Sequence, residues 1–332
     1  MPVAPSQPRP IVVVTGALGF IGSCVATALH RMGNFQVVIS DDFSATQKMR
    51  NLTHLADCER VDRSEIATWI AAHNQDTIAW VLHIGARTDT TEFDEEIFNR
   101  LNIQSTQSVW EVCTRLHIPL IYASSAATYG SGEHGYRDDH AIVPLLKPLN
   151  PYGWSKQRMD AWILQQQETP PHWYGLKFFN VYGPNEYHKG RMASVILHAF
   201  KQMQQTGRVK LFKSHHPDFR DGYQLRDFIY VQDVVQVILW LMEHKPQSGL
   251  YNLGTGKAES FYQLASSTAQ ALGIPLEIDW VDIPEDIRDK YQYFTEADMS
   301  KLRAAGYAQP FQSLSAGAFD YVTHYLIPDK VY

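Results

Sequence analysis

Short runs of consecutive apolar residues recur along the first half of the chain. Ile11–Val14 consists only of β-branched residues, without polar alternation, which is typical of a parallel strand buried on both faces. Helix-length segments such as 22–31 and 102–116 separate these runs. The pattern predicts a parallel sheet with helices on both faces, the doubly wound α/β architecture. The further strand-like runs lie at 35–39, 79–84, 118–123 and 173–179.

The pattern changes after about residue 182. Polar segments punctuated by Gly and Pro, such as 183–191 and 213–227, alternate with helical ones. One more strand-like run, 249–253, is followed by Ser260, a suitable N-cap for a helix that ends near Gly273. We therefore predict a Rossmann-type domain over 1–182, re-entered at about 228–256. The remaining segments, 183–227 and 257–332, are predicted to form a smaller C-terminal substrate-binding lobe.

Composition and charge exclude several classes of protein. Apolar residues make up 45% of the 332 positions and charged residues 19%, so the chain can bury a sizeable core. A net charge of −6 argues against a nucleic-acid binder, and no apolar run is long enough to span a membrane. Three scattered cysteines without Cys-x-x-Cys spacing favour a reducing, cytoplasmic location. The His215-His216 pair fits a polar loop better than a metal site, so no metal is predicted.

A glycine-rich turn follows the first predicted strand. Its glycines, at positions 16, 19 and 22, directly precede the first predicted helix. Gly16 permits the tight turn, Gly19 lets the backbone approach a pyrophosphate, and Gly22 lets helix and strand pack closely. The N-terminus of the helix supplies an anion site. An ordinary strand–helix turn is the alternative, but this context favours dinucleotide binding.

Charged residues near the end of the second predicted strand bear on which dinucleotide binds. Asp41 and Asp42 stand where a carboxylate can accept hydrogen bonds from the adenosine ribose, which favours NAD. Lys48, Arg50 and Arg63 follow nearby, and such cations can neutralise a 2′-phosphate. Solvated surface charge explains these cations equally well, so these residues leave NAD and NADP open.

Tyr152 and Lys156 are four residues apart, so they share one face of a helix that begins near Pro151. A nearby ammonium lowers the pKa of a tyrosine and lets the phenol exchange a proton with a substrate hydroxyl near neutral pH. Ser125, just after a predicted strand, is placed to hydrogen-bond the same oxygen. These residues predict proton transfer at a substrate hydroxyl.

Several longer segments make the chain recognisable. Ala123–Gly130, Asn150–Lys156 and Phe179–Pro184 resemble the extended short-chain dehydrogenase/reductase superfamily. Within it, the segments 188–195, 291–295 and 302–307 are similar to the ADP-L-glycero-D-manno-heptose 6-epimerase family. The resemblance extends over nearly the whole chain from Ile11. It implies an isomerase that inverts C6 of the ADP-heptose used for the lipopolysaccharide core, with tightly bound NADP and a homopentameric assembly.

The resemblance also implies roles for individual residues. Tyr152 and Lys189 would be the two acid–base groups, supported by Ser125 and Lys156. The implied substrate-binding residues are Asn180, Arg191, His198, Phe212, Lys213, Ser214, His215, Arg226 and Tyr291. The implied cofactor-binding residues, with the glycines of the turn, are Gly16, Gly19, Phe20, Ile21, Gly22, Asp41, Asp42, Lys48, Arg63, Ile84, Gly85, Ala86, Arg87, Thr88, Asn102, Lys156 and Val181.

Two features depart from the family, and two other functions stay open. Arg87 stands where family members have a small residue, and 213–227 is longer than in the shortest members. Another nucleotide-sugar epimerase or a dehydratase is the main alternative, but a dehydratase would carry carboxylates where Ser125-Ala126-Ala127 stands. A cofactor-binding sensor without turnover would be expected to lack Tyr152 or Lys156. Arg226 is expected to hold the substrate diphosphate, with Lys213 and Arg220 as further candidates.

Overall fold

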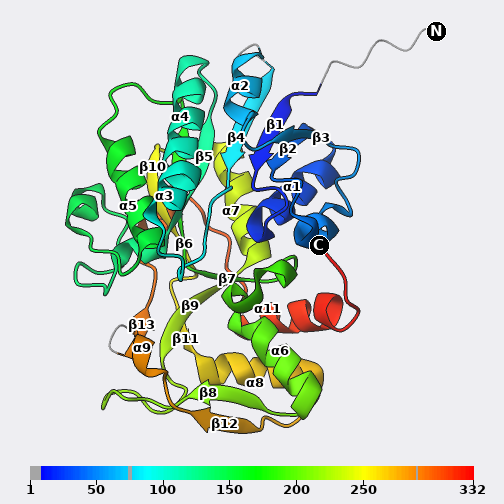
Figure 1. Cartoon of the computed structure of the whole chain (residues 1–332), viewed down its shortest axis with the longest axis vertical. Coiled ribbons are helices and arrows are strands. Elements are labelled where there is room, and N and C mark those ends of the chain that lie inside the picture. The colour runs from blue at the N-terminus through cyan, green and yellow to red at the C-terminus, as the bar shows by residue number, and fades with distance from the viewer. Residues whose placement is uncertain (1–8, 74–76, 289–290) are drawn as a thin grey trace.

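A seven-stranded parallel sheet dominates the computed structural model of the chain, which describes residues 9–73, 77–288 and 291–332 (Figure 1). The strand order is β10-β6-β5-β4-β1-β2-β3, and every pairing is parallel. This confirms the predicted Rossmann-type α/β fold. The strands are β1 (Ile11–Thr15), β2 (Gln36–Asp41), β3 (Glu59–Asp62), β4 (Ile78–His83), β5 (Leu120–Ser125), β6 (Trp173–Phe178) and β10 (Gly249–Leu253).

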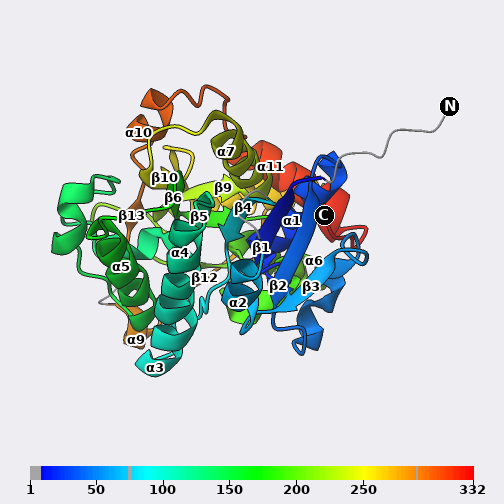
Figure 2. The ribbon, with the colours of Figure 1, turned by 90° about the horizontal axis from the view of Figure 1, so that it is seen from above.

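Both faces of this sheet are buried under helices. Val12 and Val14 belong to one hydrophobic cluster and Val13 to another, because successive side chains of a strand point to opposite faces. Figure 2 shows α4 and α5 on one side of the sheet and α7 on the other. Burial on both faces explains why the strand runs are apolar without alternation. The helices are α1 (Phe20–Met32), α2 (Ile66–Ala71), α3 (Glu95–Phe98), α4 (Ser105–Arg115), α5 (Pro151–Leu164) and α7 (Val231–His244).

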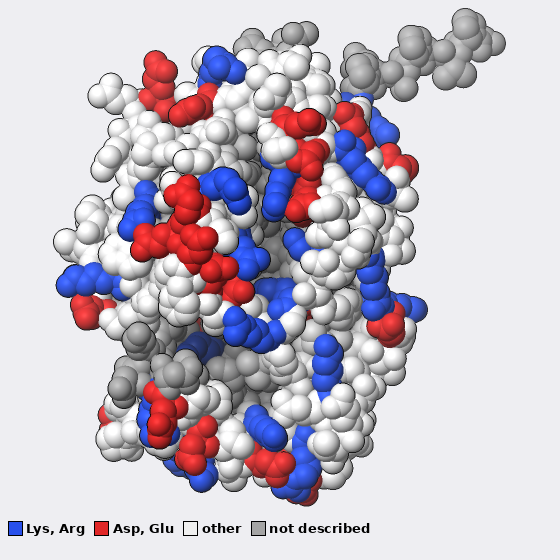
Figure 3. Space-filling model, viewed as in Figure 1, with Lys and Arg blue, Asp and Glu red and all other residues white. Residues whose placement is uncertain are grey.

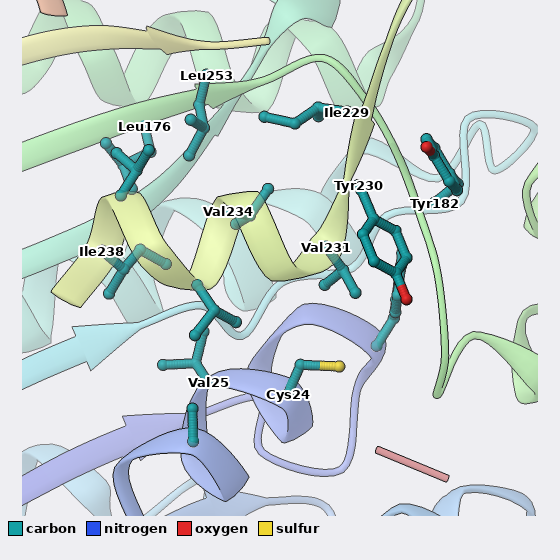
Figure 4. Packing of buried hydrophobic residues seen from close by; sticks show 14 of the residues in the cluster. Cys24, Val25, Leu176, Tyr182, Ile229, Tyr230, Val231, Val234, Ile238 and Leu253 are labelled. Carbon is teal, nitrogen blue, oxygen red and sulfur yellow. The ribbon is translucent and has the colours of Figure 1, made fainter. Parts of the chain in front are cut away.

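Helix α7 joins the C-terminal half of the chain to the large sheet. Its residues Val231, Val234 and Ile238 pack between Val25 of α1 and Leu176 of β6 (Figure 4). All five side chains are fully buried. Burying an aliphatic side chain of this size contributes about 1.5–3 kcal/mol, so the packing of α7 fixes the returning segment firmly on the sheet. β10, which follows α7, then pairs with β6 at the edge.

Smaller sheets and helices form the lower part of the molecule in Figure 1. β7 (Asn180–Tyr182), β9 (Leu225–Tyr230), β11 (Ala258–Ser260) and β13 (Phe294–Thr295) form one sheet, and β8 (Val209–Phe212) pairs with β12 (Ile278–Val281). α6 (Val195–Thr206) and α8 (Phe261–Leu272) pack on the latter pair through a separate apolar cluster. Ser260 caps α8 by accepting a hydrogen bond from the Gln263 amide at 3.0 Å, as predicted.

The remaining elements are short and connect these layers. They are the helices α9 (Glu285–Arg288), α10 (Ser300–Ala304) and α11 (Leu314–Tyr321), the 3₁₀ helices η1 (Thr46–Leu52), η3 (Ala126–Tyr129), η4 (His140–Leu145) and η5 (Tyr187–Met192), and the π-helices η2 (Asn99–Gln104) and η6 (Val322–Leu326). Among the described residues, no helix combines the length and apolar character that crossing a bilayer requires.

Two strands differ from what the apolar pattern suggests. β3 carries no apolar run, because Val61 alone of its four residues is buried at this sheet edge. β7 lies within the segment predicted as the first domain, yet it pairs with β9 of the smaller sheet. Each strand contributes too few buried side chains to show in the sequence pattern. The division at residue 182 therefore stays a prediction.

Candidate active site

The order of the strands places a ligand site between β1 and β4. The chain runs outward from β1 to β2 and β3, and outward on the other side from β4 to β5 and β6. In open α/β sheets, ligands bind beside the carboxyl ends of the strands where this reversal occurs. The glycine-rich turn follows β1, and the segment 84–88 follows β4. Both predicted cofactor segments therefore flank one crevice.

The glycines at this crevice have no room for side chains. Gly16 has a φ of +66°, and a Cβ there would lie 2.6 Å from the Cα of Gly85. A Cβ at Gly22 would lie 2.1 Å from the carbonyl oxygen of Gly16. The backbone N–H groups of Phe20 and Ile21, at the start of α1, have no partner within the helix. A narrow backbone cradle at a helix N-terminus suits a dinucleotide pyrophosphate.

Asp41 supports this turn from the end of β2. Its carboxylate accepts hydrogen bonds from the backbone N–H groups of Leu18, at 2.9 Å, and Asp42, at 2.8 Å. The ammonium of Lys48 lies 3.7 Å from the same carboxylate. Asp41 is buried, so its side chain stabilises the glycine-rich turn as well as lying near the adenosine end of the crevice.

Asp42 is the more exposed of the two carboxylates. It accepts hydrogen bonds from both the amide and the hydroxyl of Ser44, and Arg63 lies 2.9 Å away. The Ser44 hydrogen bonds and then the two cations, Arg63 and Lys48, hold the pKa of Asp42 below its usual value. Lys48 and Arg63 are thus each paired with a carboxylate at the end of β2, whereas Arg50 pairs with Asp329 at 2.7 Å.

Asn102 fixes the segment 84–88. Its side chain accepts from the Arg87 amide at 2.7 Å and donates to the Arg87 carbonyl at 3.0 Å. The same side chain donates to the Ser155 hydroxyl on α5 at 2.9 Å. Arg87 extends outward, where Asp89 and Glu92 each lie 3.5 Å from its guanidinium. Buried Asn102 thereby links the predicted cofactor segment to the helix that carries Tyr152.

Tyr152, Lys156 and Ser125 lie together at the carboxyl end of β5. Lys156 is almost fully buried, and its ammonium donates to the carbonyl of Ala123 at 2.7 Å. Burial lowers the pKa of Lys156 to about 8, an effect that the Asp160 carboxylate opposes. Burial raises the pKa of Tyr152, whereas its hydrogen bond with Ser125 lowers it. The pKa of Tyr152 is therefore raised on balance, opposite to the lowering expected from a nearby ammonium, because desolvation of the buried phenol is the largest effect.

Lys189, the second predicted acid–base residue, lies beside α1. It lies in η5, a short 3₁₀ helix after β7, and its ammonium is 5.5 Å from the ring centroid of Phe20 at the start of α1. Burial lowers the pKa of Lys189, and the carboxylate of Glu186 opposes this shift. Tyr152 stands on α5 and Lys189 beside α1, and these helices lie on the left and right of Figure 1.

The predicted substrate residues fall into two groups. Asn180 lies in β7, next to Val181 of the predicted cofactor-binding set, and His198 in α6 contacts the Arg191 carbonyl at 3.4 Å. The guanidinium of Arg191 lies 3.7 Å from Asp89, across from the segment that follows β4. This first group therefore borders the crevice of the large sheet.

The second group lies on the smaller sheets. Arg226, in β9, is enclosed by the rings of Tyr291, at 5.4 Å, and Phe261, at 5.7 Å. Its guanidinium donates to the carbonyls of Leu225 and Gln292, so Arg226 also fastens the segment before β13. Phe212 ends β8 with its ring 6.0 Å from that of Tyr291.

The loop 213–224 continues this second group. Lys213 and His215 lie 3.8 and 3.7 Å from Asp282, and the amides of Ser214 and His215 donate to Asp221 and Tyr293. Arg220 stacks on Tyr223, away from these contacts. In the space-filling view, the molecule is hollowed between its upper and lower parts, and Lys and Arg side chains line the hollow (Figure 3).

Several partners of these residues are absent from the sequence-based prediction. Asp89 pairs with Arg191, and Glu186 accepts from the Ser194 hydroxyl at 2.6 Å. Asp160 and Lys177 form a buried ion pair beneath Ser125. A sequence signal existed only for Asp160, which lies four residues after Lys156 and therefore on the face of α5 that carries Tyr152.

Comparison with known proteins identifies the family. Residues 12–254 match the model of the NAD dependent epimerase/dehydratase family. The chain belongs to this family. The match covers the glycine-rich turn, Ser125, Tyr152 and Lys156 in one continuous segment, so the resemblance stated from the sequence is confirmed.

Several similar proteins within this family bear the same enzyme name. The ADP-L-glycero-D-manno-heptose-6-epimerase of Fusobacterium nucleatum is 43% identical over 97% of this chain and 100% of its own length. The enzyme of the same name from Nitratidesulfovibrio vulgaris is 42% identical over 95% of this chain and 97% of its own. The crystal structure of the Helicobacter pylori ADP-L-glycero-D-manno-heptose-6-epimerase superposes with a TM-score of 0.77 at 26% identity, covering 95% of this chain and 96% of that one.

Proposed function

We propose that this protein is an isomerase that inverts C6 of ADP-glycero-manno-heptose. The observation that supports the proposal most is that the Lys189 ammonium lies 5.5 Å from the ring of Phe20, at the start of the helix that follows the glycine-rich turn. We infer that Lys189 faces the same crevice as Tyr152 of α5 and that the two are its acid–base groups. Full-length relatives at 42–43% identity bear the name of this activity. The backbone cradle of the glycine-rich turn fits a nicotinamide dinucleotide, which the name of the family also implies.

The chemistry requires a proton acceptor at the C6 hydroxyl. When bound, the nicotinamide group accepts a hydride from C6 and later returns it, so the sugar passes through a C6 ketone and no external redox partner is needed. Tyr152 accepts the hydroxyl proton from one epimer, with Ser125 donating a hydrogen bond to the same oxygen. Lys156, on the same face of α5, would favour the ionised phenol that accepts this proton.

A second acid–base group is needed because the hydroxyl of the other epimer points elsewhere. After the ketone presents its opposite face, the new C6 oxygen lies away from Tyr152. Lys189, beside Phe20, can protonate the oxygen there. Its lowered pKa suits this task, since burial makes the ammonium a readier proton donor and lets the neutral amine accept the proton in the reverse direction.

Other reactions on the same fold are less well supported. A dehydratase needs carboxylates beside the ketone, whereas Ser125 is followed by Ala126 and Ala127. A 4-epimerase remains the alternative, since a different sugar carbon would use the same Tyr152 and Lys156. The second lysine favours inversion at C6, on a side chain that extends from the sugar ring.

For the cofactor we propose NADP, with NAD as the alternative. Lys48 and Arg63 would contact the 2′-phosphate, although Asp41 and Asp42 now neutralise them. Replacing Asp42 with asparagine should remove a repelling charge and free Arg63. We expect the ratio of NADP to NAD released on denaturation to rise about fivefold, which mass spectrometry measures, because one such exposed contact is worth about 1 kcal/mol. An unchanged ratio would remove Asp42 from the 2′ position, and Asp57→Asn is the matched control.

Arg226 is proposed to bind the substrate diphosphate. Replacing it with alanine should raise KM for the nucleotide-sugar about 10- to 100-fold, since charge-assisted contacts are worth about 1.5–3 kcal/mol. Cofactor content should stay unchanged, because Arg226 lies on β9, away from the glycine-rich turn. Arg208→Ala, on an exposed arginine that pairs with Glu277 and Asp279 beside β8 and β12, is the control. A KM equal to that of the control would leave Arg226 with a structural role only.

The activity itself is tested by incubating the purified protein with either epimer of ADP-glycero-manno-heptose. We expect both starting epimers to reach the same equilibrium mixture without added oxidant, as followed by chromatography. UDP-glucose in parallel tests the 4-epimerase alternative, and its conversion in place of the heptose would overturn the proposal. Sedimentation of the same preparation tests the proposal that the protein forms a homopentamer. We also propose that the reaction takes place in the cytoplasm.

A further inference from the structure

A buried ion pair lies beneath the proposed catalytic residues. The carboxylate of Asp160 and the ammonium of Lys177 are 2.6 Å apart, with side-chain exposures of 0% and 1%. Asp160 shares one face of α5 with Tyr152 and Lys156, which lie eight and four residues earlier in the helix. Lys177 comes from β6, which pairs with β5. The pair therefore joins the catalytic helix to the strand beside Ser125.

The polar atoms of the pair are well satisfied. Besides Lys177, Asp160 accepts hydrogen bonds from the hydroxyls of Tyr122, at 2.9 Å, and Ser124, at 2.7 Å. Lys177 donates to the Thr128 hydroxyl at 2.8 Å and lies 5.1 Å from the ring centroid of Tyr129. Such a complete network fixes one arrangement of the surrounding elements.

The contacts of this network converge on the end of β5. Ser124, held by Asp160, directly precedes Ser125. Thr128, held by Lys177, donates to the Ser125 carbonyl at 2.8 Å. Lys156 donates to the Ala123 carbonyl from the same helix as Asp160. Three consecutive residues, 123–125, are thus tied to α5 directly or through the ion pair.

Stability alone does not account for this pair. Moving two charges out of water costs several kcal/mol for each ion, and apolar side chains of similar volume are often equally stable or more so. The rings of Tyr122 and Tyr129, which contact the pair, are almost fully buried. An apolar pair would therefore fit the core, but it would not orient Ser124 and Thr128.

We propose that Asp160 and Lys177 are positioning residues, which hold Ser125 and Lys156 in the geometry that proton transfer through Tyr152 requires. The proposal rests on the function proposed above. Neither side chain reaches the crevice, so both act through the hydrogen bonds to Ser124, Thr128 and the end of β5.

Asp160 also acts on the charge of Lys156. The groups that interact electrostatically with Lys156 are Asp160 on its own helix and His83 of β4. Burial, followed by the charge of Lys156, lowers the pKa of His83 to about 3, so His83 is neutral at physiological pH. Since the Asp160 carboxylate favours the charged form of Lys156, its removal should move the deprotonation of Lys156 to lower pH.

The main test replaces both members of the pair, because a single unpaired buried charge destabilises a protein. For Asp160→Asn with Lys177→Met, we expect kcat to fall about 10- to 100-fold with KM nearly unchanged, as small displacements in a site do. Cofactor content and Tm should stay close to wild type. The single variant Lys177→Arg, which keeps the charge, should retain most of the wild-type kcat. Arg208→Met, which breaks the surface contacts to Glu277 and Asp279, is the control.

The second measurement needs no substrate. The ionisation of Lys156 is followed by NMR of protein labelled with ¹³C at lysine Cε and assigned with Lys156→Met. In the double variant Asp160→Asn, Lys177→Met, which leaves no unpaired buried charge, we expect its midpoint, and the alkaline limb of kcat, to move to lower pH. Wild-type kcat in the double variant, or an unmoved midpoint, would overturn the positioning role. If the wild-type protein leaves ADP-heptose unchanged while the midpoint moves, the proposed function fails and the link between Asp160 and Lys156 stands.

Discussion

Replacing Lys189 with alanine should abolish net epimerisation, with a loss of about 10³-fold or more in kcat. Inversion places the C6 oxygen of the two epimers in different positions, and Tyr152 serves only one of them. The variant should fold and keep its cofactor, because Lys189 lies in the short 3₁₀ helix η5 and its side chain is only partly buried. Turnover from both epimers, followed by chromatography, gives the result.

A half reaction separates this role from a general loss of activity. With Lys189→Ala, the epimer served by Tyr152 should still reduce the bound cofactor in a single turnover, which the absorbance of reduced nicotinamide reports. Lys201→Ala, which removes an exposed lysine on α6, is the matched control. Near wild-type turnover of Lys189→Ala would show that Tyr152 acts alone.

Replacing Tyr152 with phenylalanine should have an equally large and complementary effect. The phenol oxygen is lost, so the proton of one epimer has no acceptor, and kcat should fall by about 10³-fold or more. The ring keeps its place beside Phe98, whose centroid lies 6.3 Å away, so fold and cofactor content should be retained. Rapid mixing with each epimer should show cofactor reduction only by the epimer that Lys189 serves.

Tyr262→Phe is the control for this variant, since Tyr262 stacks on Tyr223 in the smaller lobe. Equal loss of the half reaction with both epimers would contradict two separate bases. Taken with Lys189→Ala, opposite epimer preferences in the two variants are the signature of the proposed arrangement.

Local spacing explains which parts of the site were predictable from sequence. The glycine-rich turn lies within eight residues, and Tyr152 and Lys156 are one helical turn apart, so chain geometry alone brings each set together. The large sheet was predictable for a similar reason. Burial on both faces requires unbroken apolar runs, and β1 has one.

Contacts between distant segments were not predictable in this way. Asn102 joins Arg87 to Ser155, and Lys177 joins Asp160 to Thr128, across three or more elements of the fold. The direction in which a side chain points was not predictable from the sequence either. The spacing of Asp41 from the glycine-rich turn suggests a contact with ribose, whereas its carboxylate accepts hydrogen bonds from the backbone of the turn. These contacts depend on how distant elements pack against each other, and the pattern of a single sequence does not reveal that packing.

The fate of the hydrogen on C6 tests the account most directly. The holoprotein is incubated with ADP-glycero-manno-heptose deuterated at C6, and with unlabelled substrate in deuterated water, and the products are examined by NMR and mass spectrometry. Removal and return of one hydrogen within the closed crevice predicts inverted product that keeps its deuterium at C6 and gains none on carbon from the solvent. Solvent deuterium at C6 of the inverted product would contradict transient oxidation at this carbon.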